Sequence, residues 1–83
     1  MNKILVKVFF PRIDQWYEIW IPINQNISTI IALLCKGANE LSGDSFKFND
    51  MLILYNRLTG EYYNYNDIVK ETNIKNGTEL ILI

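Results

Sequence analysis

The sequence contains no histidine and only one cysteine, Cys35. Without an imidazole there is no base for Ser-His or Cys-His catalysis and no ligand for histidine-dependent zinc sites. A lone cysteine can form neither the thiolate clusters that hold zinc or iron-sulfur centres nor an internal disulfide. The four glycines are too scattered to make a phosphate-binding loop. We therefore expect no enzymatic activity, no metal and no cofactor.

An excess of charge of one sign is also missing. Eight basic and nine acidic residues give a formal net charge of -1, and like charges form no run. A surface of this kind has no strong attraction for nucleic acid or anionic lipid. The apolar stretch from Ile4 to Phe10 is short and is interrupted by Lys7, unlike a signal peptide or a membrane span. These features predict a cytoplasmic protein with no nucleic-acid partner and no direct insertion into a membrane.

The first part of the chain predicts a β-hairpin. Apolar and polar residues alternate over residues 3–10 and again over residues 16–21, and many of them are β-branched or aromatic. Pro11 and Pro22 end the two strands because proline cannot donate a hydrogen bond to the ladder. Only the short polar link 12–15 separates the strands, so we expect them to pair with each other.

An amphipathic helix is predicted next, over residues 27–41. Its apolar residues recur at spacings of three and four and share one face: Ile27, Ile30, Ile31, Leu34, Cys35, Ala38 and Leu41. Asn26 or Ser28 can cap its first turn, and residues 42–44 end it. Cys35 lies at the edge of the apolar face with no basic side chain directed at it, which predicts a buried, unreactive thiol. Leu33, off this face, is a weaker second candidate for a contact surface.

The remaining sequence predicts a strand at residues 51–55 and a brief strand at 61–63. A helical turn that Asn66 or Asp67 caps, an Asn76-Gly77 turn and a last strand at 79–83 follow. The whole order predicts a single α+β domain over residues 1–83, in which one helix packs across one face of a mixed four- or five-stranded sheet.

The face of this sheet away from the helix carries the candidate site. The residues predicted to point inward are Val6, Ile19, Leu52, Leu54, Leu80 and Leu82. Period-two alternation then sends five large apolar side chains outward: Leu5, Trp20, Ile53, Ile81 and Ile83. Scattered exposed apolar residues are common, but five on neighbouring strands can form the kind of patch that marks a partner site. We predict that these five bind protein, with Lys7, Glu18 and Glu79 around them setting the register.

Two stretches carry a resemblance to known proteins. The ending NIKNGTELILI resembles the last turn and strand of ubiquitin, and the order of elements resembles the ubiquitin-like β-grasp fold. Together with YEIWIPINQNISTIIALL, the longer ending NDIVKETNIKNGTELILI is similar to the bacterial YukD/EsaB family of type VII secretion accessory proteins. The resemblance implies a non-catalytic accessory or regulator that binds a secretion-machinery component or forms a homodimer. It also implies recognition through the outer sheet face, where Ile53, Ile81 and Ile83 match the position of ubiquitin's apolar patch.

Two other functions share this fold. A covalent modifier or sulfur carrier would need a flexible tail that ends in Gly-Gly, whereas this sequence ends at Ile83, so we expect no such chemistry. An orphan β-grasp protein of a phage or mobile element, which binds a host factor, is the remaining alternative. The sequence does not distinguish it from a secretion accessory.

Overall fold

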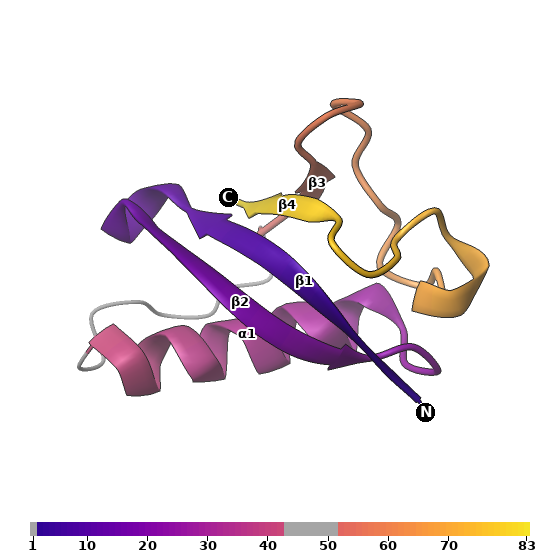
Figure 1. Ribbon diagram of the computed structural model, residues 1–83, viewed down its shortest axis with the longest axis horizontal. Coiled ribbons are helices and arrows are strands. Elements are labelled where there is room, and N and C mark those ends of the chain that lie inside the picture. Colours follow the sequence, from indigo (N-terminus) through magenta and orange to yellow (C-terminus); the bar gives the residue numbers. More distant parts are fainter. Residues whose placement is uncertain (1, 43–51) are drawn as a thin grey trace.

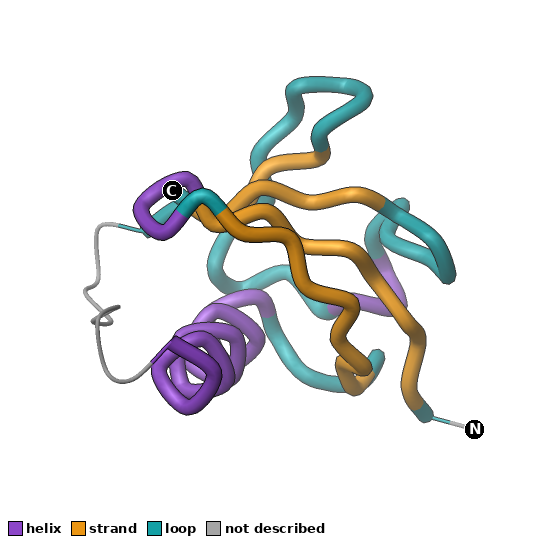
Figure 2. The backbone as a smooth tube through the Cα atoms, turned by 60° about the vertical axis from the view of Figure 1, so that its left-hand side comes forward, coloured by secondary structure: helices purple, strands orange, loops and turns teal. Residues whose placement is uncertain are grey.

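The computed structural model describes residues 2–42 and 52–83. Its elements follow the order β1 (Lys3–Phe10), η1 (Pro11–Ile13), β2 (Gln15–Pro22), α1 (Ile27–Ser42), β3 (Leu54–Asn56), η2 (Val69–Glu71) and β4 (Glu79–Leu82). Within these residues four strands form one mixed sheet in the order β2-β1-β4-β3. Helix α1 runs along one side of the sheet, which gives two layers (Figures 1 and 2). The predicted α+β architecture is confirmed, with four strands in the part of the chain that the structure describes.

The β1–β2 hairpin forms as the alternation predicts. The two strands pair antiparallel over their whole length, from Lys3 opposite Pro22 to Phe10 opposite Gln15. Pro11 ends β1 and opens a single 3-10 turn, for which its fixed φ angle is well suited. Asp14 closes the turn in the left-handed conformation, with φ of 52°. Aspartate tolerates this conformation better than most residues do.

The first turn of α1 is anchored by another part of the chain. Asn26 is the cap, because its Oδ1 accepts a hydrogen bond of 2.9 Å from the Thr29 amide. The Ile27 and Ser28 amides donate to the carbonyls of Asp67 and Tyr65 at 2.9 and 3.0 Å. The helix therefore begins with its orphan amides satisfied, and its start is fixed to the segment before η2.

The core lies between α1 and the inner face of the sheet. Every member of the predicted helix stripe whose side chain is described is buried, and the same is true of most inward strand positions. Five of the six residues predicted to point inward are buried: Val6, Leu52, Leu54, Leu80 and Leu82. Ile19 is only partly buried but packs against this cluster. Leu41 lies outside the side chains that the structure describes.

The strand predicted over residues 51–55 differs from the observed one. β3 covers only Leu54–Asn56, and Met51 lies outside the described residues. Ile53 nevertheless exchanges two backbone hydrogen bonds with Ile83, at 2.7 and 3.0 Å, so the pairing with the end of the chain continues past the strand limits.

The brief strand predicted at residues 61–63 is wrong, because only a single bridge between Tyr62 and Tyr55 forms there. The chain turns away after Tyr63, since the next carbonyls are used by the start of α1. The predicted cap of the following helical turn is also wrong. η2 begins after Ile68, which makes no side-chain cap, and the Asp67 carboxylate instead accepts from the Asn64 amide.

The Asn76-Gly77 turn connects β4 to the centre of the sheet. Gly77 has φ of 85°, as a tight turn requires. The Asn76 Oδ1 accepts a hydrogen bond of 2.8 Å from the Leu5 amide, and the Leu5 carbonyl accepts one of 2.9 Å from Gly77. β4 then runs parallel to β1, with Lys7 opposite Glu79. Residues 71 positions apart along the chain thus become neighbours.

Two glycines offer a matched test of this backbone. A Cβ added at Gly37 in α1 meets nothing within 4 Å, whereas one at Gly77 is strained by the positive φ. We expect Gly37→Ala to raise the free energy of unfolding by about 0.5–1 kcal/mol, and Gly77→Ala to lower it by about 1 kcal/mol. Urea denaturation followed by circular dichroism measures both. Destabilisation by Gly37→Ala would contradict the packing around α1.

Candidate protein-binding face of the sheet

The side of the sheet away from α1, here called the outer face, displays one side chain in two from each strand. On β1 the side chains of Leu5, Lys7 and Phe9 alternate with buried Val6 and Val8. On β2 the outward residues are Trp16, Glu18 and Trp20, each exposed. Because the strand registers fix which of these residues lie opposite one another, the outer face is organised as rows that cross the strands.

One row is built from large aromatic and aliphatic side chains. Trp16 lies opposite Phe9, Phe9 opposite Ile81, Ile81 opposite Tyr55, and Tyr55 opposite Tyr62. We call these five residues the aromatic row. At the usual strand spacing, the row extends for about 19 Å. Its Phe9 and Trp16 rings are in contact, with centroids 5.2 Å apart and planes inclined by 41°.

Ile53 and Ile83 extend the apolar surface on one side of the aromatic row. Their reciprocal backbone hydrogen bonds place them directly opposite each other. Ile83 is 50% exposed, and Ile53 is partly buried. Three of the five predicted binding residues, Ile53, Ile81 and Ile83, therefore come together with aromatic neighbours.

A charged row borders the aromatic row on its other side. Lys7 lies between Glu18 on β2 and Glu79 on β4. Arg57, just beyond β3, donates from Nη1 to Glu79 Oε1 at 2.8 Å, and its guanidinium carbon lies 5.8 Å from the centroid of a Trp16 ring. Both charged side chains are partly exposed, so the ion pair adds little to the free energy of unfolding. We call Glu18, Lys7, Glu79 and Arg57 the charged row.

The remaining two predicted residues, Leu5 and Trp20, lie opposite each other beyond the charged row. Trp20 is 55% exposed, and Leu5 is partly buried. The structure therefore does not bring the five predicted residues into one patch. The expectation that Lys7, Glu18 and Glu79 surround the patch is wrong: they cross the face between its two apolar parts, because the strand register places them there.

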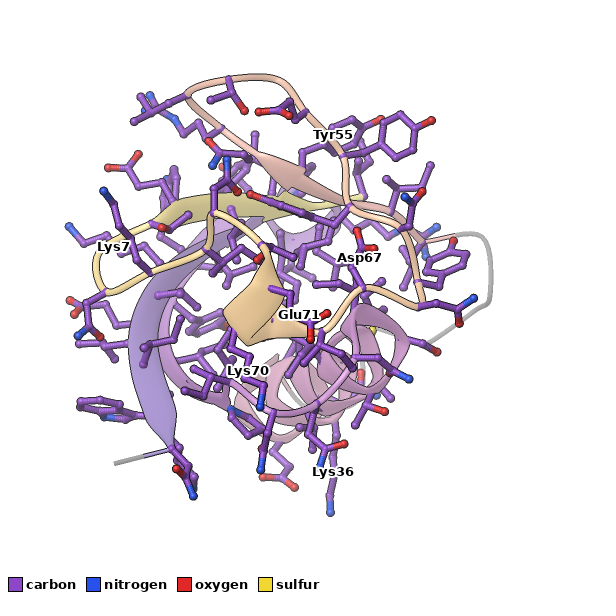
Figure 3. The ribbon with its side chains drawn as sticks, turned by 90° about the vertical axis from the view of Figure 1, so that its right-hand side faces the viewer. Lys7, Lys36, Tyr55, Asp67, Lys70 and Glu71 are labelled. Carbon is purple, nitrogen blue, oxygen red and sulfur yellow. The ribbon has the colours of Figure 1, made fainter. Side chains whose placement is uncertain are left out.

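Two shallow hollows flank Lys7 and Glu18. One of about 460 Å³ is lined by Lys7, Trp16, Tyr17, Glu18 and Glu79. The other, of about 270 Å³, is lined by Leu5, Lys7, Glu18, Trp20, Asn76 and Gly77. The outer face is thus a contoured surface with apolar and charged parts. Figure 3 shows Lys7 on the sheet and Lys36 on the separate helical layer.

Sequence reasoning missed four members of the aromatic row: Phe9, Trp16, Tyr55 and Tyr62. For three of them the signal was present, because Phe9 has the parity of Leu5, Trp16 that of Trp20 and Tyr55 that of Ile53. Tyr62 had no such signal, since its place depends on the bridge to Tyr55.

Helix α1 carries the two other residues that the sequence singled out, Leu33 and Cys35. Leu33 is 45% exposed on α1, as expected for a residue off the apolar stripe. Cys35 is buried and unpaired in any disulfide. Burial raises the pKa of its thiol to about 11, an effect that the positive charge of Arg12 opposes only in part. The prediction of a buried thiol is confirmed, and a thiol with this pKa is almost entirely un-ionised near neutral pH.

Within residues 2–42 and 52–83, no three cysteine, aspartate or glutamate side chains gather in a way that could hold a metal ion. The described helices include none of the length and apolarity needed to cross a membrane.

Comparison with known proteins gives a fold and no family. No family model matches the sequence, and no curated protein matches it. A structure from work on molecular mimicry of SUMO in DNA repair is similar over all of this chain and 92% of its own, with 16% identity and a TM-score of 0.78. The ubiquitin-like domain of the Mycobacterium tuberculosis type VII secretion protein ECCD1 is similar over all of this chain and 99% of its own, with 14% identity and a TM-score of 0.75.

A third structure is also similar. A chain of the ESX-5 inner membrane complex matches with 13% identity and a TM-score of 0.78; the whole of this protein corresponds to 21% of that chain. These identities establish a shared fold alone. The protein has the ubiquitin-like α+β fold, in which a single helix packs on a mixed sheet.

The buried thiol leads to a simple chemical test. At pH 8 a group with pKa about 11 is thiolate roughly 100 times less often than one at the ordinary value of 9.0. We therefore expect iodoacetamide to alkylate Cys35 in the folded protein at least about 100-fold more slowly than in the urea-unfolded chain. Mass spectrometry over time measures both rates, and equal rates would show that the thiol is accessible and ionised.

Proposed function

We propose that this protein is a non-catalytic interaction module that binds another protein through its outer sheet face. The observation that carries the proposal is the aromatic row, which continues into Ile53 and Ile83 on the side of the sheet that α1 leaves uncovered. Aromatic residues are enriched at protein interfaces, where they bury a large area at a small entropic cost. On a sheet face in contact with water, polar residues are the normal choice.

The setting that we propose is a bacterial type VII secretion system, in which the protein acts as a cytoplasmic accessory or regulator like YukD and EsaB. Two observations support this setting. The stretches YEIWIPINQNISTIIALL and NDIVKETNIKNGTELILI resemble that family. Two of the structural neighbours come from type VII secretion proteins. The partner would then be a component of the secretion machinery or a second copy of this chain.

The proposed mechanism is docking onto a preformed surface. The residues directly beneath the aromatic row, Val8, Phe10, Leu80 and Leu82, are fully buried, so the strands that display it are fixed by the core. Burial of the aromatic row supplies the affinity, because apolar area is removed from water. The charged row selects one orientation of the partner, because a misplaced charge loses hydration with no compensating pair.

A substitution pair tests whether the outer face is the binding surface. We expect Ile81→Asp to abolish co-purification of tagged protein with type VII secretion components from the native cell, because it puts a carboxylate in the centre of the aromatic row. Leu33→Asp is the matched control, since it places the same charge on the exposed side of α1. Quantitative mass spectrometry of the captured proteins reads the result.

Each variant is first shown to be folded by circular dichroism. Loss of binding with Leu33→Asp and not with Ile81→Asp would move the site to the helix and contradict the proposal. Capture of other host-cell proteins with no secretion component, as expected for a phage or mobile-element protein, would contradict the type VII setting. The outer face would remain the binding site.

A further inference from the structure

The charged row of the outer face is complementary to its own reversed copy. Across β2, β1, β4 and the end of β3, the charged row reads negative, positive, negative, positive: Glu18, Lys7, Glu79, Arg57. A row of alternating sign with an even number of members matches its own reversed copy. This alternation of charge depends on the register of four strands. It indicates that the face can pair with a second copy of itself.

We infer that the outer face binds the outer face of a second copy of this chain. This inference rests on the proposed function and specifies its partner. The two-fold axis lies in the interface, parallel to the strands and between β1 and β4. Such an axis keeps each row at its own height along the strands and reverses its order across them, as an isologous dimer requires. The two sheets then pack face to face with their strands nearly aligned.

Rotation about this axis pairs every charge with its opposite. Lys7 comes to face Glu79 of the partner subunit, and the symmetry repeats this contact a second time. Glu18 comes to face Arg57 of the partner subunit, also twice. No like charges face each other in this arrangement, whereas an axis between β2 and β1 would set Lys7 against Glu18 and leave Glu79 and Arg57 beyond the overlap.

The same rotation pairs the apolar side chains. Phe9 faces Ile81 of the partner subunit, and Trp16 faces Tyr55 of the partner subunit. Each contact occurs twice, so eight large side chains meet at the centre of the interface. An aromatic core of this kind, next to a row of paired charges, has the composition of specific protein interfaces.

The side chains are placed for exchange between copies. Lys7 lies directly opposite Glu18 within the sheet, yet Arg57–Glu79 is the ion pair that forms on the described part of this face. Side chains of Arg57 and Glu79 are 49% and 33% exposed, so both can turn towards a partner. Exposed ion pairs within a chain are weak. Exchange for pairs between subunits gives up this weak pair and moves Arg57 away from the Trp16 ring, and the new charge pairs offset both losses.

The width of the face limits the size of the contact. Four strands at about 4.8 Å spacing give a narrow contact, and specific interfaces at the small end of the size range are typical of transient association. We therefore expect a reversible dimer.

Charge exchange between two variants tests the inference. Sedimentation velocity from about 5 to about 500 µM is expected to show a monomer-dimer equilibrium for the wild-type chain. Lys7→Glu alone and Glu79→Lys alone each set like charges against each other, and each should weaken dimerisation at least about 10-fold. An equimolar mixture of the two variants restores both pairs, so it should form a heterodimer of near wild-type affinity. Lys36→Glu on α1 is the control and should leave the dimer unchanged.

Three results would overturn the inference: a wild-type chain that stays monomeric over the whole range, single variants that dimerise normally, or a mixture that does not recover. The second result would place association on a surface that uses neither Lys7 nor Glu79, such as the edge of β2. Circular dichroism of each variant separates lost association from lost folding. A monomeric chain that still loses its secretion partner on Ile81→Asp would refute the dimer and leave the proposed function intact.

Discussion

The parallel pairing of β1 with β4 is the interaction on which the rest of this structure depends. β1 and β2 form one local hairpin, and β3 and β4 form a second pair; among the described residues the β1–β4 ladder joins the two into one sheet. The Asn76-Gly77 turn stabilises this ladder, because the Asn76 side chain accepts from the Leu5 amide and the Gly77 amide donates to the Leu5 carbonyl. A parallel connection cannot be made by a tight turn, so the chain reaches it through α1 and the long segment that follows.

The same pairing builds both faces of the sheet at once. On the inner face it sets Val8 beside Leu80 within the core beneath α1. On the outer face it sets Phe9 beside Ile81 and Lys7 beside Glu79. Because side chains alternate strictly across a strand, a slip of one residue in this ladder would expose the core and bury the charged row. One register therefore fixes both the buried core and the proposed binding face.

A second constraint orients α1 over the sheet. The amides that open the helix bond to carbonyls of residues 65 and 67, while the Val69 and Lys70 amides bond to carbonyls of residues 25 and 23. These bonds pair backbone donors of each segment with carbonyls of the other, and together they hold the two segments side by side. They also explain why the chain leaves the sheet after the Tyr62 bridge, so that β3 has no long further neighbour among the described residues.

Much of the fold could be predicted from local sequence pattern, and the predictions that were wrong have physical causes. Alternation over β1 and the three-four spacing in α1 were reliable because each reports the burial of one face of one element. Residues 61–63 look like a strand and bond to β3 through the Glu61 carbonyl and the Tyr63 amide. The pairing stops at the Tyr62–Tyr55 bridge because the carbonyls of residues 65 and 67 accept bonds from the start of α1. The outward positions on each strand were also predictable, yet Phe9 and Trp16 were overlooked although they share the parity of Leu5 and Trp20.

The sequence by itself determined which side of each strand and helix faces the core, because that choice depends only on the period of the apolar residues. The tertiary structure decided which outward residues become neighbours. Trp16, Phe9, Ile81 and Tyr55 come from four strands, and only the registers of three separate ladders bring them into one row. The same registers place Lys7 and Glu79 between the two apolar parts of the face. Register is set by backbone hydrogen bonds between distant segments, and no local pattern contains that information.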